Sequence, residues 1–209
     1  FLLPDYLGDY SAFKEGTEQP VQSGGKIGAA VLEKLRQKIR PFILRRLKKD
    51  VAKDLPDKIV RVSYCPMSVE QQRLTNELRM KAKAAHTKFE MLAVLMRMRQ
   101  IANHPSLVEK GAADSSGKLE AFFDVLDEAM AGGHRSLVFS QFVSMLSILR
   151  RELDKRGIRY CYLDGSTKDR LGECRKFNRS DIPVFLISLH AGGTGLNLTG
   201  ADTVIHFDP

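Results

Sequence analysis

The residues with the clearest chemical potential lie in a glycine-rich stretch, residues 186–208, where an apolar run ends at Ser188 and the letters LHAGGTG follow. Glycine has no Cβ, so backbone amides in such a turn can approach phosphate oxygens closely. The pattern predicts a strand ending at Ser188, a helix beginning near Leu196 and a second apolar strand over residues 203–207. A generic strand–helix–strand crossover without a ligand fits the same spacing, because short glycine motifs have low specificity.

Uncharged hydrogen-bond donors follow the other apolar runs at the equivalent point. Gln141 follows the run 136–140, and Ser166 and Thr167 follow the run 159–163. Hydroxyl and amide donors, joined by glycine-exposed backbone amides, hold a phosphate backbone without reading bases. The same segments contain no nucleophile–base pair and no carboxylate pair flanking a pocket, so we expect no catalytic residue in this chain.

The elements that must position these residues alternate regularly over residues 111–209. Helices are predicted over residues 118–130, 143–155 and 167–178, and strands over residues 136–140, 159–163, 184–188 and 203–207. Continuous apolar strands alternating with helices indicate an α/β fold, a parallel sheet covered by helices on both faces. Ligands of such sheets lie at the carboxyl ends of the strands, so residues 140–142, 164–167, 188–193 and 208–209 should share one edge.

Residues 1–110 show a different, mainly helical pattern. Residues 1–26 are rich in Gly and Pro and are expected to form a loop or linker. Helices are expected over residues 27–40, 42–53, 68–85 and 87–102, and a strand over residues 58–65. Pro41 should end the first helix, and Ser68 with Gln71 should form a reciprocal cap. The apolar residues expected to point inward from the last helix are Met91, Leu92, Leu95 and Met98.

Three further features attract a catalytic interpretation but fit structural roles. Asn103-His104-Pro105 closes a predicted helix, where Asn and Pro favour a cap and turn. His206 lies within an apolar strand and is expected to be a core or cleft residue. Asp164 follows a strand, but the next residues indicate a phosphate-contacting turn.

The basic charge lies in the N-terminal half. The chain carries a formal net charge of +8, and residues 1–110 hold 21 Lys and Arg against 12 Asp and Glu. Residues 34–49 contain eight basic residues and no acidic one. A run of this kind without a compensating carboxylate favours a polyanionic partner, whereas the ordinary alternative is a solvated helix face.

The cysteines and the apolar runs exclude several classes. Cys65, Cys161 and Cys174 are odd in number and widely spaced, without a Cys-x-x-Cys pair. They are expected to be small core residues in a reducing compartment, so neither a disulfide framework nor a metal site is predicted. No apolar run has the length of a membrane span, and no membrane partner is expected.

Seven segments occur in an order that is highly specific as a set. They are residues 40–46 (RPFILRR), 55–58 (LPDK), 97–105 (RMRQIANHP), 116–119 (SGKL), 138–142 (VFSQF), 163–167 (LDGST) and 191–202 (AGGTGLNLTGAD). In this order they resemble the second motor lobe and helical insertions of a SWI/SNF-type helicase-like ATPase of superfamily two. The last segment is similar to the bacterial branch. The resemblance covers essentially the whole chain.

The resemblance implies a motor of two RecA-like lobes, the first of which binds ATP and Mg²⁺ through a Walker A loop. That loop is absent here, since residues 111–118 have one residue too many and Leu119 stands where a hydroxyl belongs. By this resemblance residues 1–26 link to the first lobe, 27–110 form the helical insertion and 111–209 form a RecA-like second lobe that stops before its arginine motif. We therefore expect this fragment alone to be inactive.

The resemblance also assigns contacts residue by residue. Implied contacts to the phosphates of one DNA strand are Gly165, Ser166 and Thr167, with Gln141, Ser188, Leu189 and His190 along the same track. Implied neighbours of the nucleotide in the interlobe cleft are Gly193, Gly195 and Asn197. His190 replaces the Lys or Arg common in the family, which weakens that contact or makes it pH-sensitive. Arg45 and Arg46 fit a structural salt bridge as well as a DNA contact, and Lys118 is a weaker DNA candidate.

The implied function is an ATP-driven translocase on double-stranded DNA, acting with the first lobe of the same polypeptide and with a DNA-bound protein as a candidate substrate. Such a protein is expected in the nucleus of a eukaryote, or associated with the nucleoid in the cytoplasm of a bacterium. A non-catalytic DNA-binding or regulatory module that keeps only this lobe is the alternative. A Rossmann-type nucleotide enzyme would need a Gly-x-Gly-x-x-Gly after its first strand, which is absent. A strand-separating helicase shares the fold but not the segment 40–46.

Overall fold

The computed structural model describes residues 5–47, 51, 58–83, 87–112, 116–192 and 195–208. The chain divides into two compact units, Phe1–Val60 and Arg61–Pro209, and each is described by itself. Within the described ranges, no helix is both long and apolar enough to cross a membrane.

The first unit is helical. It contains α1 (Tyr10–Phe13), the π-helical turn η1 (Lys14–Glu18), α2 (Gln19–Ser23), α3 (Gly25–Ile39) and the 3₁₀ turn η2 (Arg40–Phe42). Asp9 caps α1, because its carboxylate accepts from the amides of Ser11 and Ala12. Helices α2 and α3 pack closely at Gly28, where a Cβ would lie 2.5 Å from the carbonyl oxygen of Pro20.

Two expectations for this unit are wrong. Residues 10–23 are helical although their Gly and Pro content predicted a loop, since Pro20 falls in the first turn of α2, where proline is tolerated. Residues 43–47 form no helix, in contrast to the prediction of a helix over 42–53, because Pro41 lies within the 3₁₀ turn η2 and Ile43, which follows it, is extended. The rest of that predicted helix, apart from Val51, falls in 48–53 outside the described residues. The helix expected over 27–40 is confirmed.

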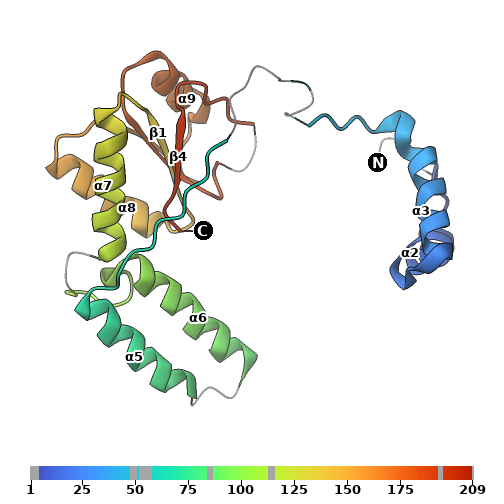
Figure 1. The fold of residues 1–209 in the computed structure, drawn as a ribbon, viewed down its shortest axis with the longest axis horizontal. Helices are drawn as coiled ribbons and strands as arrows, with labels where there is room; N and C mark the ends of the chain where they lie inside the picture. The colour runs from blue at the N-terminus through green and yellow to red at the C-terminus, as the bar shows by residue number, and fades with distance from the viewer. Residues whose placement is uncertain are drawn as a thin grey trace. The chain divides into compact units, whose positions relative to one another are not determined.

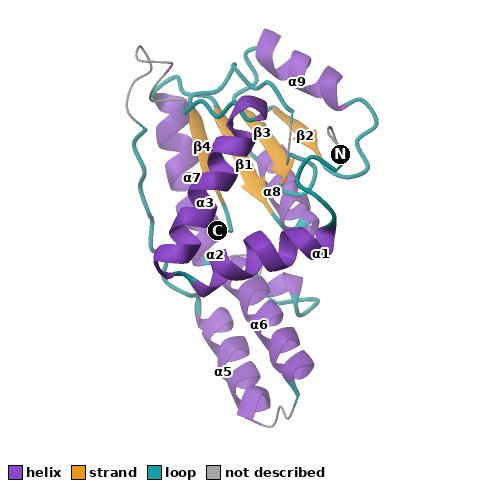
Figure 2. Ribbon diagram, turned by 90° about the vertical axis from the view of Figure 1, so that its right-hand side faces the viewer, coloured by secondary structure: helices purple, strands orange, loops and turns teal. Residues whose placement is uncertain are grey.

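The second unit is built on a four-stranded parallel sheet with the order β2-β3-β1-β4. Its strands are β1 (Ser136–Ser140), β2 (Tyr160–Leu163), β3 (Val184–Ser188) and β4 (Thr203–His206). All three pairings are parallel, and Ser140 lies opposite Ser188 in the register. The predicted α/β parallel sheet is confirmed, and Figure 2 shows the four strands side by side.

Helices cover both faces of this sheet. Helices α7 (Gly117–Ala131) and α8 (Val143–Lys155) pack on one face, and α9 (Arg170–Arg179) packs on the other (Figure 1). The first core includes Leu126, Leu149 and Leu186, and the second includes Phe177 and Phe185, all fully buried. Apolar residues on both sides of each central strand produce the continuous apolar runs seen in the sequence.

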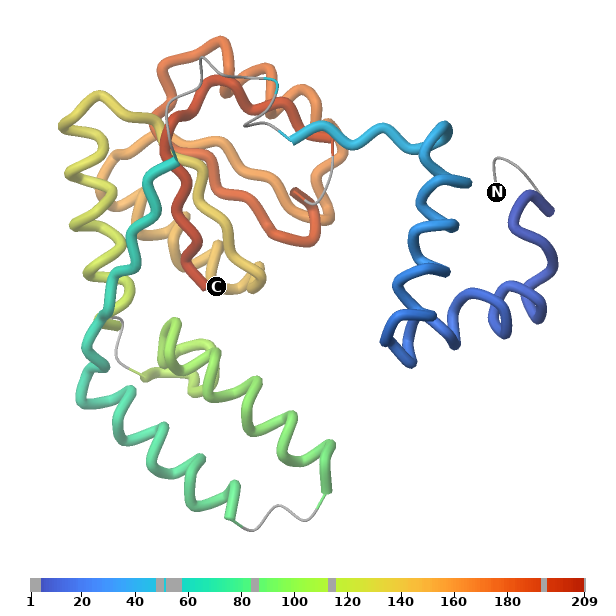
Figure 3. The backbone as a smooth tube through the Cα atoms, turned by 45° about the vertical axis from the view of Figure 1, so that its right-hand side comes forward, coloured from blue at the N-terminus to red at the C-terminus, as the bar shows by residue number. Residues whose placement is uncertain are grey.

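A helical hairpin precedes the sheet. Helices α5 (Val69–Lys83) and α6 (Lys88–Asn103) run side by side and lead through the short 3₁₀ helix η3 (Pro105–Leu107) toward α7 (Figure 3). The reciprocal cap of Ser68 and Gln71 is confirmed, with amide-to-side-chain distances of 2.9 and 3.3 Å. Thr87 and Glu90 form a second capping box at the start of α6.

The hairpin differs from its prediction in packing. Met91, Leu92 and Leu95 were expected to point inward, but their relative exposures are 40, 62 and 50%. Met98 alone of this set packs on the small core of Leu74, Leu78 and Ile101. Helical periodicity identifies an apolar face, but it does not say whether a covering element exists.

The strand expected over residues 58–65 is also absent. This segment is extended and exposed, with Val62 73% and Tyr64 93% accessible. A strand requires a ladder partner, and none of the described strands pairs with these residues. The segment leads into Pro66, which packs against the start of α7.

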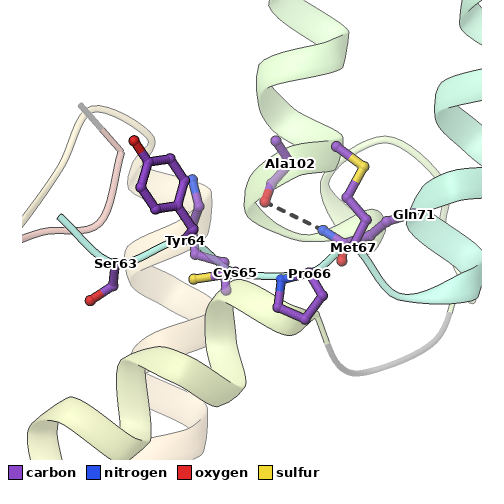
Figure 4. A pocket seen from close by; sticks show the side chains of 8 residues that line it. Ser63, Tyr64, Cys65, Pro66, Met67, Gln71 and Ala102 are labelled. Atoms are coloured by element: carbon purple, nitrogen blue, oxygen red, sulfur yellow. Dashed lines mark hydrogen bonds between the residues drawn. The ribbon is translucent and has the colours of Figure 1, made fainter.

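Gln71 holds this junction together. Its side-chain oxygen accepts from the amide of Gly117, and its amide nitrogen donates to the carbonyls of Ile101 and Ala102 at 2.7 and 3.3 Å. Figure 4 shows Gln71 beside Ala102 in the shallow hollow lined by residues 63–67. The junction therefore joins the start of α5, the end of α6 and the start of α7.

Candidate nucleic-acid interface

The carboxyl ends of the strands bring the predicted donor segments to one edge of the sheet. Because the strand order is β2-β3-β1-β4, the segments lie along this edge in the order 164–167, 188–192, 140–142 and 207–208. We call it the carboxyl edge. This is the location where parallel sheets bind ligands.

The turn after β2 is organised by Asp164. The Asp164 carboxylate accepts from the amide and the hydroxyl of Ser166, at 2.8 and 2.7 Å, and from the hydroxyl of Thr167 at 3.3 Å. Thr167 Oγ1 in turn accepts from the Asp164 amide at 2.9 Å. The Ser166 hydroxyl is the largest cause of a lowered Asp164 pKa, because it stabilises the charged carboxylate.

This arrangement leaves Gly165 at the exposed tip of the turn. A Cβ built on Gly165 would meet nothing within 4 Å, so its backbone is open to an approaching group. Tyr162 supports the turn from within the sheet, since its hydroxyl donates to Asp164 at 2.9 Å. Burial, together with that hydrogen bond, raises the pKa of Tyr162 to about 12. The phenol therefore stays protonated and keeps donating at neutral pH.

The turn after β3 separates buried from exposed residues. Ser188 is 1% exposed, whereas Leu189 and His190 are exposed. The Ser188 carbonyl accepts from the amides of Ala191 and Gly192 at 3.0 and 2.8 Å, which closes the turn. The Ser188 side chain is thus buried at the end of β3. Of the three residues predicted to contact DNA in this turn, only Leu189 and His190 are exposed.

The turn after β1 is fastened by Asp208. The amide of Gln141 donates to Asp208 Oδ1 at 2.9 Å, and the hydroxyl of Ser140 donates to Asp208 Oδ2 at 2.9 Å. Asn103 Nδ2, at the end of α6, donates to the same Oδ2 at 3.2 Å. The sequence pattern predicts residue 208 at this edge, but it indicates no role for the carboxylate.

Lys118 belongs to this same group of contacts. Its Nζ donates to Asn103 Oδ1 at 2.8 Å and lies 5.8 Å from the centroid of the Phe207 ring. Burial lowers the pKa of Lys118, while the nearby Asp208 opposes that change. Lys118 is half-buried, and its amine has Asn103 as a hydrogen-bond partner within the second unit.

The residues expected near a nucleotide lie in the segment that returns to β4. Gly193 lies outside the described residues. Gly195 adopts φ +78°, and the Asn197 carbonyl accepts from Asn178 Nδ2 of α9 at 2.9 Å. The helix expected to begin near Leu196 is absent from the described residues 195–202, because Gly195 and the turn at Gly200 break its continuity.

The structure also places three other residues or pairs singled out in the sequence. Arg45 and Arg46 are exposed in the first unit, in the extended segment that follows η2. His104 is the C-cap of α6 and accepts from the Ser106 amide at 3.2 Å, so the predicted cap and turn are confirmed. His206 is exposed on the edge strand and stacks on Phe139 with centroids 5.5 Å apart, so of the two expected positions, core or cleft, the core is wrong.

Comparison with known proteins identifies the family. The sheet, its helices and the donor segments at its carboxyl edge define a RecA-like lobe. The SNF2-related domain matches residues 1–107, and the helicase conserved C-terminal domain matches residues 117–209. The chain belongs to the SNF2-related family.

Individual relatives agree with this assignment. The chain is 34% identical over its whole length to the SWI/SNF chromatin-remodeling complex subunit snf22 of Schizosaccharomyces pombe, and 36% identical to the putative ATP-dependent helicase/translocase YwqA of Bacillus subtilis. It spans 14% and 24% of those proteins, respectively. The solved SWI2/SNF2 ATPase C-terminal domain of Sulfolobus solfataricus matches 69% of each chain at 29% identity and a TM-score of 0.61.

Proposed function

We propose that this chain is the second motor lobe, with helical insertions, of an ATP-dependent double-stranded DNA translocase of the SWI/SNF type. The observation that carries the proposal is the carboxyl edge, where exposed uncharged donors and open backbone follow adjacent parallel strands. Such groups bind phosphates at any sequence, and a motor must release and rebind at every base pair.

The proposed DNA track runs along three turns of this edge. It comprises Gly165, Ser166 and Thr167, then Ser188, Leu189 and His190, then Gln141. Among its exposed members, Gly165, Ser166 and His190 would meet the phosphates directly, whereas the exposed Leu189 has no polar side chain. The buried Ser188 would act by shaping its turn. Lys118 would act from within the lobe, because Asn103 already accepts from its amine.

ATP and Mg²⁺ would be held mainly by a first lobe of the same polypeptide. Gly193, Gly195 and Asn197 would face that nucleotide across the interlobe cleft. ATP binding would close the lobes and hydrolysis would reopen them, so that the DNA-bound lobe steps along the duplex. Under this proposal residues 1–26 link to the first lobe, 27–110 form the insertion and 111–209 form the second lobe. The setting is chromatin or the nucleoid, with a DNA-bound protein as a candidate cargo.

ATP hydrolysis by the whole protein tests the proposal. Hydrolysis should be strongly stimulated by duplex DNA, weakly by single strands, and undetectable with this chain alone. Equal rates with duplex, with single strands and without DNA would contradict the motor. DNA binding without any hydrolysis would instead support a regulatory module that keeps only this lobe.

A further inference from the structure

Four side chains from four different elements meet beneath the carboxyl edge. They are Asn103 at the end of α6, Lys118 in the first turn of α7, Ser140 at the end of β1 and Asp208 after β4, joined by the hydrogen bonds already described. We call this set the edge network. Asn103, Ser140 and Asp208 are 1, 0 and 3% exposed.

The edge network is a costly way to hold a fold together. A buried carboxylate and a half-buried ammonium lose hydration, and their attraction only partly offsets that loss. Apolar residues of similar volume often give equal or greater stability in such positions. The polar composition therefore calls for a role other than stability alone.

The position of the edge network indicates that role. Asp208 Oδ1 accepts from the backbone amide of Gln141, the first residue of an edge turn, while Oδ2 accepts from Asn103 at the base of the hairpin. The shared carboxylate makes the two positions interdependent. A shift of α6 by about one hydrogen-bond length would alter the acceptor available to Gln141, because hydrogen bonds weaken steeply with distance and angle.

We propose that Asp208 is a positioning residue that fixes the Gln141 turn for DNA and couples it to the α5–α6 hairpin through Asn103 and Lys118. The DNA part of this inference rests on the proposed function. The coupling itself concerns only the contacts within the second unit. Forces on the hairpin would thereby change the grip of the carboxyl edge on the phosphate backbone.

A charge-preserving exchange tests the pairing. Asp208→Asn leaves one acceptor oxygen, which serves the Gln141 amide. It removes the acceptor for Asn103 and the carboxylate near Lys118. The double variant Asn103→Asp with Asp208→Asn restores the charged hydrogen bond between the two positions and a carboxylate near Lys118, with the carboxylate now at position 103. The carboxylate introduced at position 103 would accept from Lys118 and from the amide introduced at position 208, whose oxygen would still accept from Gln141. Ser140 can then donate to the Phe142 carbonyl, which it already faces at 3.3 Å.

The first readout is the duplex concentration that gives half-maximal stimulation of ATP hydrolysis by the whole protein. Asp208→Asn should raise it about tenfold, the order expected for a lost charged hydrogen bond, and the double variant should return it to within about threefold of the original. Ile148→Val in α8 is the control, because it lowers stability without touching the edge network. A control shift equal to that of Asp208→Asn, or no recovery in the double variant, would overturn the proposal.

The second readout separates this inference from the proposed function. In Asp208→Asn, amide hydrogen exchange should quicken about tenfold both over residues 139–143 and at the end of α6. In the double variant, the hydrogen-exchange rates at both places should return together to those of the original protein. Change at only one of the two places would overturn the coupling. If duplex DNA does not stimulate ATP hydrolysis by the whole protein, the DNA role is refuted. The hydrogen-exchange rates at the two places would still decide whether they are coupled.

Discussion

The Gln71 side-chain oxygen accepts from the backbone amide of Gly117 at 3.3 Å, although the two residues lie 46 positions apart. The same oxygen accepts from the Ser68 amide, so one buried acceptor serves the starts of two helices. The α5–α6 hairpin is thereby fastened to α7, the helix that also carries Lys118.

Replacing Gln71 should loosen the hairpin. Gln71→Met keeps the volume but removes the acceptor for Ser68 and Gly117 and the donor to Ile101. Buried groups left unpaired cost about 1–3 kcal/mol each, so a loss of about 2–4 kcal/mol in the free energy of unfolding is expected. Thermal unfolding of the protein measures this, with Asn76→Ala on the exposed face of α5 as the control. Equal melting temperatures for the two variants would contradict the role of Gln71.

A methyl group at Gly117 should not be tolerated. A Cβ there would lie 1.8 Å from the carbonyl oxygen of Pro66, and neither backbone can yield without breaking the cap of α7. Gly117→Ala should therefore lower the unfolding free energy by more than about 2 kcal/mol. Gly16→Ala is the matched control, since its Cβ would meet nothing within 4 Å. The close packing of Pro66 on α7 would be disproved by a Gly117→Ala protein as stable as the control.

The Asp164 turn should respond to acid in a defined direction. The Asp164 pKa is lowered in the folded protein, chiefly by the Ser166 hydroxyl, so its stabilising effect is complete above the unfolded value of about 3.9. It is lost as the pH falls through the lower folded value. Ser166→Ala should move the carboxyl titration midpoint, followed by NMR, upward toward about 3.9. An unchanged midpoint would mean that the hydroxyl does not bind the carboxylate in solution.

The salt dependence of DNA binding should decide between two roles for Arg45 and Arg46. If both contact phosphates, the double alanine variant should reduce the slope of log affinity against log salt by about 0.9 for each lost contact on duplex DNA. Arg159→Ala is the control, because Arg159 pairs with Asp181 at 2.8 Å at the amino ends of β2 and β3. A structural salt-bridge role predicts lower stability and an unchanged slope.

Elements that are buried as their own apolar pattern indicates could be predicted from the sequence, whereas elements that depend on a distant partner could not. Strands β1 and β3 and helix α8 have the bounds predicted from their apolar patterns, because each is buried on the faces that its pattern describes. Residues 58–65 alternate like a strand but lack a pairing partner among the described strands, which a local pattern cannot reveal. Leu92 and Leu95 were misjudged for the same reason, since burial depends on a second element.

The candidate site could likewise be predicted in part from the sequence. The edge of the sheet was predictable, because parallel strands place their carboxyl ends together. The hydrogen bonds among Asn103, Lys118 and Asp208 were not, because they join segments up to 105 positions apart. The Asn-His-Pro cap was correctly predicted at His104, yet the side chain of the adjacent Asn103, the last residue of α6, reaches across to Asp208 after β4. Only the folded arrangement reveals that contact.

Movement along a duplex tests the central claim most directly. The whole protein should displace a third strand bound in the major groove of a duplex when ATP is present, and the rate should fall by about tenfold or more in a Ser166→Ala, His190→Ala double variant that retains its fold. Control reactions contain a non-hydrolysable ATP analogue, which should support no displacement. ATP-dependent displacement that weakens in the variant is the predicted result. ATP hydrolysis without displacement, or displacement unaffected by the variant, would contradict a translocase that grips DNA along the carboxyl edge.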